Sequence, residues 1–318
     1  MKHLILKTAP LIMAALIGQH AYSQAPAALP SEIEGPIDSV RLLDNGTVVM
    51  RVMGIRINVR PGTPIASPTA ALSLQQLADP TPLPGRTQEG FERGTAIVIG
   101  TTNAAGVITA DDVFVEPAEN VVVGVVTENT GGTLQLNGMP VSFLADPRIP
   151  AAPLKNAFGF EILASSVLPG TPASVEGYYA GGVFNAFLME VEGNAQLANP
   201  NPQISVLRAD SRERTPNNER GDEVDVRGAI TAAHVAPGVT TQTIRVFRVD
   251  NGVQRALGTT IATLDPATPG FASWNFRIAT TPTNNVVLGS TPTLLRARNI
   301  SPGANNVTVE AVPTVRLD

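Results

Sequence analysis

Apolar residues occur in short alternating runs separated by glycine, proline and asparagine over most of the chain. The runs at 37–43, 47–59, 95–100 and 107–116 are typical, and Val, Ile and Thr recur in them. A period of two bounded by turn residues indicates β-strands with one buried face. Residues 67–78 instead place apolar side chains at helical spacing, starting at Ser67-Pro68. The pattern predicts an all-β protein with little helix.

One stretch of the sequence occurs twice. Residues 94–116 and 170–192 align at a constant offset of 76 without a gap, which places Gly106 on Gly182 and Val115 on Val191. In the first unit the predicted order is three strands, a helix and two strands, the order of a five-stranded OB-type barrel. We therefore predict two tandem OB-like barrel units, residues 33–117 and 118–193.

The second half of each repeat changes its buried face. Ile108 and Ala110 are at even positions and Val113 and Val115 at odd positions, so the apolar side chains move from one face of the strand to the other. In the second copy the apolar face changes after the equivalent residue. A change of face within one strand requires an extra residue. We expect β-bulges at Asp111-Asp112 and at Phe187-Leu188.

The turn glycines and core positions of residues 33–193 resemble the tandem OB-like repeats of a family of exported bacterial proteins whose function is unknown. The resemblance implies a fold and carries no catalytic residue. It covers most of residues 33–193.

A different pattern follows the Asn- and Pro-containing linker at 194–203. Seven short apolar runs between 204 and 312 have the spacing of a β-sandwich. The segment 270–276, which contains Trp274, resembles a strand of bacterial immunoglobulin-like domains. We predict an immunoglobulin-like β-sandwich over 204–318, in which packing around Trp274 replaces a disulfide because the chain has no cysteine.

The first 23 residues have the layout of a secretory signal peptide: Lys2 and Lys7, a short apolar run, and small residues before Gln24. The run is shorter than the roughly 20 residues that span a bilayer. We expect cleavage after Ser23, a linker at 24–32, and an exported product in the periplasm or outside the cell. The absence of cysteine excludes a lipoprotein anchor.

Charge is divided unevenly along the expected mature chain. Residues 24–203 carry a formal charge of −9 and residues 204–318 carry +2. The acidic first part argues against nucleic acid as a partner, because phosphates require clustered Lys and Arg.

Candidate catalytic and metal sites are weak. His234 is the only histidine after the signal peptide, which disfavours a zinc site or a Ser-His-Asp triad. Asp111-Asp112 is the tightest carboxylate pair for a glycan hydrolase, although a solvated bulge explains it better. The acidic loop 210–225 suits calcium, but interleaved arginines favour internal ion pairs. We predict no cofactor and no metal.

Tyr178 and Tyr179 are the only tyrosines after the signal peptide, and they are adjacent. Aromatic side chains at a hairpin can stack on a sugar ring or a partner protein, or one can belong to the core and the other cover it. We take them as the candidate binding residues. The sequence favours a non-enzymatic binding or structural protein whose partner is an envelope protein, a glycan or another copy of itself, with a glycan-acting hydrolase or a fibre subunit as alternatives.

Overall fold

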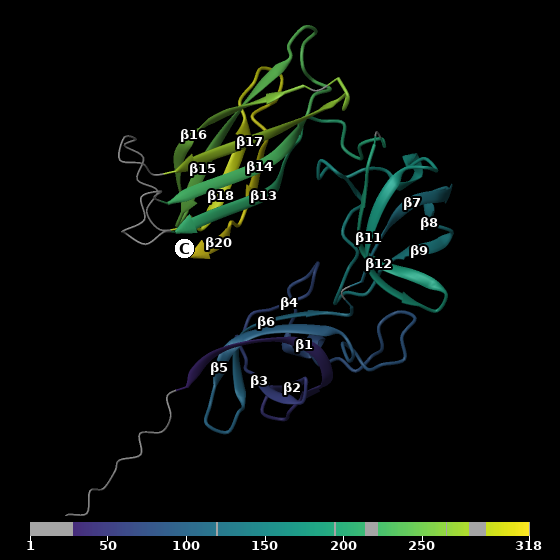
Figure 1. Ribbon diagram of the computed structural model, residues 1–318, viewed down its shortest axis with the longest axis vertical. Coiled ribbons are helices and arrows are strands. Elements are labelled where there is room, and N and C mark those ends of the chain that lie inside the picture. The colour runs from purple at the N-terminus through teal and green to yellow at the C-terminus, as the bar shows by residue number, and fades with distance from the viewer. Residues whose placement is uncertain are drawn as a thin grey trace, which may run out of the picture.

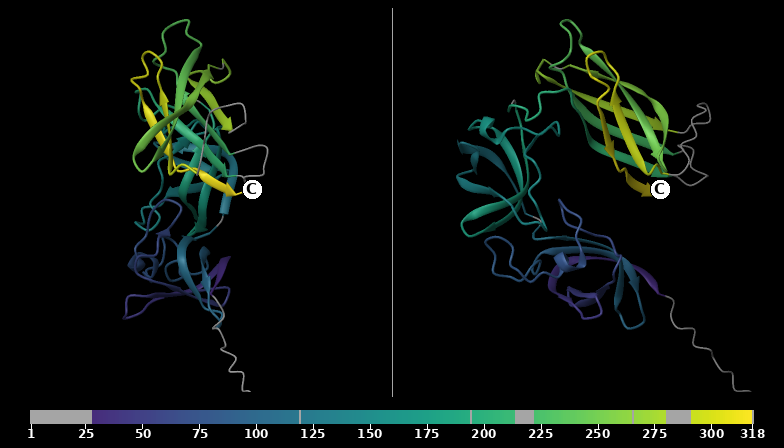
Figure 2. Two further views of the ribbon diagram at one scale, coloured as in Figure 1. Left: turned by 90° about the vertical axis from the view of Figure 1, so that its left-hand side faces the viewer. Right: turned by 180° about the vertical axis from the view of Figure 1, so that it is seen from behind.

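The computed structural model describes residues 28–118, 120–193, 195–213, 222–264, 266–279 and 291–317. The predicted signal peptide, residues 1–23, lies outside them. The chain forms two closed five-stranded barrels and a two-sheet sandwich along an arc, with the second barrel in the middle (Figure 1; Figure 2). This confirms the predicted all-β fold class. Within the described residues, no helix has the length and apolar character needed to cross a membrane.

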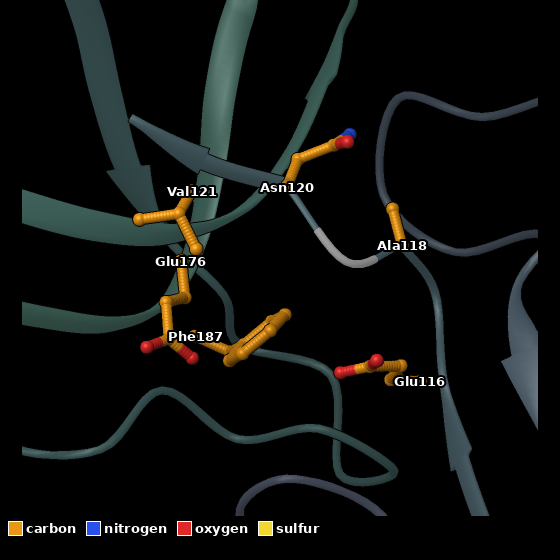
Figure 3. A pocket seen from close by; sticks show the side chains of 6 residues that line it. All are labelled: Glu116, Ala118, Asn120, Val121, Glu176 and Phe187. Atoms are coloured by element: carbon orange, nitrogen blue, oxygen red, sulfur yellow. The ribbon is translucent and has the colours of Figure 1, made fainter. Parts of the chain in front are cut away.

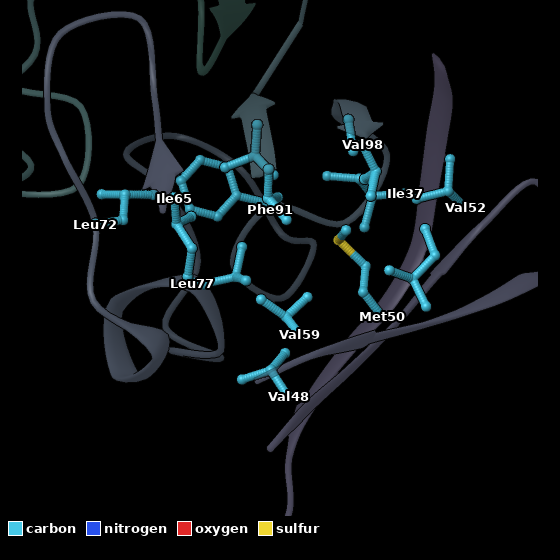
Figure 4. Packing of buried hydrophobic residues seen from close by; sticks show 14 of the residues in the cluster. Ile37, Val48, Met50, Val52, Val59, Ile65, Leu72, Leu77, Phe91 and Val98 are labelled. Carbon is cyan, nitrogen blue, oxygen red and sulfur yellow. The ribbon is translucent and has the colours of Figure 1, made fainter. Parts of the chain in front are cut away.

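The first barrel is a sheet of order β3-β2-β1-β5-β6, closed by parallel pairing of β6 with β3. This is the strand order of an OB-type barrel. Inward-facing Val, Ile and Met side chains together with Phe91 fill its interior (Figure 4). Its elements are β1 (Leu29–Leu42), β2 (Val48–Val52), β3 (Ile55–Val59), β4 (Ile65–Ala66), α1 (Leu74–Leu77), β5 (Thr95–Thr102) and β6 (Ile108–Glu116).

The second barrel repeats this topology, with order β9-β8-β7-β11-β12 and parallel closure of β12 on β9. A 3-10 turn at Ala164–Ser166 takes the place of the helix. Its strands are β7 (Asn120–Thr130), β8 (Thr133–Leu136), β9 (Met139–Phe143), β10 (Lys155–Asn156), β11 (Pro172–Ala180) and β12 (Val183–Val191).

Both predicted bulges are present. Ile99 pairs with Asp112 and Gly100 with Ala110, so Asp111 is the extra residue of β6; Phe187 is the extra residue of β12 in the same way. The predicted offset of 76 residues between the two copies is wrong by one residue in the first strand of the repeated hairpin, which is β5 in the first barrel and β11 in the second. Gly100 corresponds to Gly177 while Ala110 corresponds to Ala186, because the second hairpin is one residue shorter.

Two local expectations differ from the structure. β1 begins at Leu29, which pairs with Thr102, so residues 29–32 belong to a strand and not to the linker. The helix begins after Ser73 and not at Ser67, because Ser73 and Gln76 form a capping box. Ser67 instead closes a turn with Ala70 and donates its hydroxyl to the Arg148 carbonyl at 2.7 Å.

The C-terminal sandwich has sheets of order β17-β14-β13-β20 and β16-β15-β18-β19, with Trp274 buried between them. The strands β17-β14-β13 of one sheet and β16-β15-β18-β19 of the other have the order of an immunoglobulin-like domain. Seven strands match the predicted runs; the eighth, β20, was not predicted and pairs in parallel with β13. The strands are β13 (Ile204–Glu213), β14 (Glu223–Thr231), β15 (Thr241–Asp250), β16 (Val253–Thr263), β17 (Phe271–Ala279), β18 (Leu294–Asn299), β19 (Thr308–Ala311) and β20 (Thr314–Leu317).

Buried side chains connect the modules. Leu144, Ile149, Tyr178 and Phe187 of the second barrel belong to the same buried cluster as the core of the first barrel. At the other end of the second barrel, the Phe158 ring stacks on Phe271 of the sandwich with a centroid distance of 4.7 Å. The junction of the two barrels is therefore a continuous apolar contact, and it frames the site described below.

Candidate functional site

Two hollows flank the short link between the barrels, which runs from the end of β6 at Glu116 to the start of β7 at Asn120. Both are lined in part by Ala118, and they differ in charge. One contains two arginines and the other contains two glutamates. We call them the basic groove and the acidic pocket.

The basic groove has a volume of about 300 Å³ and lies between the loop 85–93 of the first barrel and the β11 end of the second. Arg86, Arg93, Tyr178 and Tyr179 are its largest lining side chains. The loop and the hairpin approach closely, since a Cβ on Gly85 would lie 3.1 Å from the Ala180 Cβ. The groove therefore exists only where the two barrels meet.

Arg86 is held in place by backbone carbonyls. Its Nη1 donates to the Pro117 oxygen at 2.9 Å and its Nη2 to the Glu92 oxygen at 2.6 Å. Burial lowers the pKa of Arg86, and the nearby charge of Arg93 acts in the same direction. Within the part of the chain that the structure describes, neither arginine forms an ion pair with a carboxylate. Both arginines line the groove, and no carboxylate among the described residues neutralises their charge there.

The two candidate tyrosines take different roles, because neighbours on a strand point to opposite faces. Tyr178 is buried at 3% exposure, and its hydroxyl donates to the Pro84 carbonyl at 2.9 Å. The Arg86 guanidinium lies over its ring, 5.6 Å from the centroid. Tyr179 is 60% exposed at the groove. Tyr178 therefore builds the wall and supports Arg86, and Tyr179 is the aromatic ring available to a ligand.

The acidic pocket, of about 220 Å³, contains one glutamate from each barrel. Glu116 ends β6, Glu176 lies on β11, and in Figure 3 the Phe187 ring lies between their carboxylates. The sequence gives no sign of this pair, because the two residues are brought together only by the docking of the barrels.

The other sequence candidates fall elsewhere. Asp111 and Asp112 are exposed on the β6 bulge. The acidic loop 210–225 is described only at its two ends, where two of the expected ion pairs with neighbouring arginines are present, Arg208–Asp210 and Arg227–Asp225. Glu223 pairs instead with Arg277 of β17. Residues 214–221 lie outside the described part.

Sequence reasoning missed Arg86 and Arg93. One signal was available: they are two of only seven arginines in an acidic half of the chain, and they lie seven residues apart in a loop with few apolar positions. Comparison with protein-family models, with curated proteins and with solved structures found no match to this chain.

Proposed function

We propose that this protein is an exported, non-enzymatic binding protein of the bacterial envelope or extracellular space, and that its basic groove binds an anionic glycan. The observation that carries the proposal is the pair of cations at Arg86 and Arg93, without a carboxylate partner among the described residues, beside the exposed ring of Tyr179.

The chemistry of the groove suits a sugar that carries a negative group. A guanidinium binds a carboxylate or sulfate through directed, charge-assisted hydrogen bonds. An exposed tyrosine offers a flat apolar face and a polar hydroxyl, which match the face and rim of a sugar ring. Arg86 is already oriented by Pro117 and Glu92, so little conformational entropy is lost when a ligand binds it.

Binding is favoured over hydrolysis at this groove. The described residues that line it include no aspartate or glutamate, whereas glycoside hydrolysis uses two carboxylates. The acidic pocket across the link would repel a second anionic group, which favours one orientation of the glycan.

The test is a glycan array that contains carboxylated, sulfated and neutral oligosaccharides, probed with the chain from residue 24 onward. We expect binding to the acidic members, reduced about tenfold or more by Arg93→Ala and by Tyr179→Ala. Arg41→Ala removes an exposed arginine that does not line the groove and is the matched control. Loss of signal in the control alone, or acidic binding that both groove variants retain, would reject the proposal.

One observation favours a glycan-acting hydrolase as the second candidate: Glu116 and Glu176 share a pocket. Turnover of a polysaccharide that stops in Glu176→Gln but continues in Arg93→Ala would support it. A fibre subunit has less support, because β1 and β20, the first and last described strands, both pair within the chain.

A further inference from the structure

We propose that one edge of the second barrel binds an extended segment of a partner protein, with apolar side chains at alternate positions and a basic residue at one end. The site is the outer edge of β7 at Val121 and Val123, beside the acidic pocket. It is separate from the basic groove and does not depend on the glycan proposed above.

The backbone groups along this edge of β7 have no strand beside them. Successive residues of a strand direct their N–H and C=O groups to opposite sides. Val126 donates its N–H toward the β11 side, whereas the Val125 N–H donates to Asn137 Oδ1 at 3.0 Å on the other side. By this alternation Val121 and Val123 direct their N–H and C=O groups away from β11. Among the described residues β8 pairs with β7 only from Val126 onward, so no strand meets those groups.

The side chains of the same stretch form an exposed apolar row. Val121, Val123 and Val125 lie on the outer face of β7, and the first two are 57% and 73% exposed. A sheet edge that combines open backbone groups with exposed β-branched side chains is suited to strand addition. Every second side chain of an added strand lies on the same face as the valines. The segment that fits is therefore apolar at alternate positions.

The equivalent edge of the first barrel is protected against strand addition. With Gly100 aligned to Gly177, the pairing of β1 with β5 and of β7 with β11 aligns the outer positions of β1 and β7. The first barrel then has Glu32, Glu34 and Pro36 where the second barrel has the three valines. Charged side chains and proline, which has no N–H, are common means of blocking a sheet edge. Of the two duplicated barrels, the second is thus the one whose edge suits an added strand.

The carboxylates beside the valine row favour a basic residue in the partner. Val121 pairs with Glu176 of β11, and both line the acidic pocket together with Glu116 (Figure 3). Within the described part of the chain Glu176 forms no ion pair. A residue added opposite Val121 is two strand spacings, roughly 10 Å, from Glu176. An extended arginine side chain reaches the carboxylate over that distance and forms charge-assisted hydrogen bonds with it.

The first test uses the capped peptide Thr-Val-Thr-Val-Thr-Arg with the chain from residue 24 onward, followed by two-dimensional ¹H–¹⁵N NMR. We expect saturable binding, and at nine-tenths occupancy about tenfold slower hydrogen exchange of the Val121 and Val123 amides. The Val122 amide, which is directed to β11, should change little. The control peptide has proline in place of its second valine and should bind at least about tenfold more weakly. No saturable binding, equal binding of the two peptides, or unchanged exchange in the saturated protein would overturn the proposal.

The second test gives the edge of the second barrel the glutamates of the first, by combining Val121→Glu with Val123→Glu. We expect affinity for the arginine peptide to fall at least about tenfold. Val253→Glu, at a 56% exposed position of β16, is the matched control and should bind as wild type does. Unchanged affinity in the folded double variant would contradict the assignment, and if that variant does not fold, the exchange measurement decides. Light scattering that finds dimers dissolved by Val123→Glu would make a second copy the occupant and overturn the assignment to a partner protein.

The third test addresses the basic residue of the segment. Glu176→Gln should lower affinity for the arginine peptide about two- to fivefold, as expected for a partly exposed ion pair. It should leave unchanged the affinity for a peptide with threonine in place of arginine. An equal effect on both peptides would contradict the role of Glu176.

Discussion

Gly100 and Gly177 lie opposite the two bulges, and neither position has room for a side chain. A Cβ on Gly100 would lie 2.2 Å from the Thr109 oxygen, and one on Gly177 would lie 2.1 Å from the Asn185 oxygen. We expect Gly100→Ala to lower the free energy of unfolding by about 3 kcal/mol, because backbone atoms must shift. Urea denaturation measures this. Gly106→Ala, which has a left-handed backbone but open space, should cost only about 1 kcal/mol.

The phenol of Tyr178 makes stability depend on alkaline pH. Burial raises the pKa of Tyr178 to about 12, against a reference value of 10.0 for a free tyrosine. Between pH 10 and about 12 the folded protein binds more protons than the unfolded chain. The contribution of Tyr178 to the free energy of unfolding is therefore complete below pH 10 and is lost as the pH rises to about 12.

We therefore expect the stability difference between wild type and Tyr178→Phe to shrink over this pH interval in urea titrations. At neutral pH the variant should be about 1 kcal/mol less stable, because the buried Pro84 carbonyl loses its donor. Tyr179→Phe is the control, since its ring is exposed. A difference that does not change with pH would contradict this role of Tyr178.

At the scale of elements, β6 and β12 have the same bulge and use it differently. The extra residue of β12, Phe187, packs into the core of the first barrel, whereas its equivalent in β6, Asp111, is exposed. We expect Phe187→Ala to cost about 3–5 kcal/mol and Asp111→Ala to stay within about 0.5 kcal/mol of wild type, as measured by urea denaturation. Equal effects would show that the bulge does not hold the barrels together.

The segment between β9 and β10 adds a buried ion pair to the same junction. Arg148 donates from Nε and Nη2 to Asp146 at 2.9 and 2.7 Å, and from Nη1 to the Thr81 carbonyl of the first barrel at 2.8 Å. We expect Arg148→Met to cost about 3–5 kcal/mol, because it leaves a largely buried carboxylate without its partner. Arg41→Met, at an exposed position, should have little effect.

This ion pair also predicts the response to acid. The hydrogen bond from Arg148 lowers the pKa of Asp146 below its reference value of 3.8. The contribution of the Asp146–Arg148 ion pair to the free energy of unfolding is therefore present above pH 3.8, and it is lost as the pH falls through the lower pKa that Asp146 has in the folded protein. Acid titrations of wild type and Arg148→Met should converge there, and curves that stay parallel would contradict this account.

The sequence predicts an element correctly where its local pattern of apolar and polar residues is sufficient to determine the structure. The bulges follow from the parity of Ile108, Ala110 and Val113, which depends only on which side chains are buried. The helix start was wrong because the chain has a serine at both positions: Ser67 forms a turn with Ala70 and donates its hydroxyl to the Arg148 carbonyl of the other barrel, whereas Ser73 caps the helix. The one-residue error in the repeat offset arose in a hairpin, where length is not fixed by packing.

At the scale of the whole molecule, the sites depend on contacts between distant parts of the chain. Arg86 and Tyr179 line one groove although they come from different barrels. The sequence identified Tyr178 and Tyr179 as a pair, but only the docked barrels show that one is buried and the other is exposed. Composition could not reveal the positive groove, because the half that contains it is acidic overall.

The most direct measurement is isothermal titration of the chain from residue 24 onward with a galacturonate oligosaccharide and with the same oligosaccharide after reduction of its carboxyl groups. The groove of Arg86, Arg93 and Tyr179 predicts that the acidic form binds at least about tenfold more tightly than the reduced form and that its affinity falls as salt is added. Equal affinity for the two forms, at low and at high salt, would contradict the assignment of this groove as an anion-binding site.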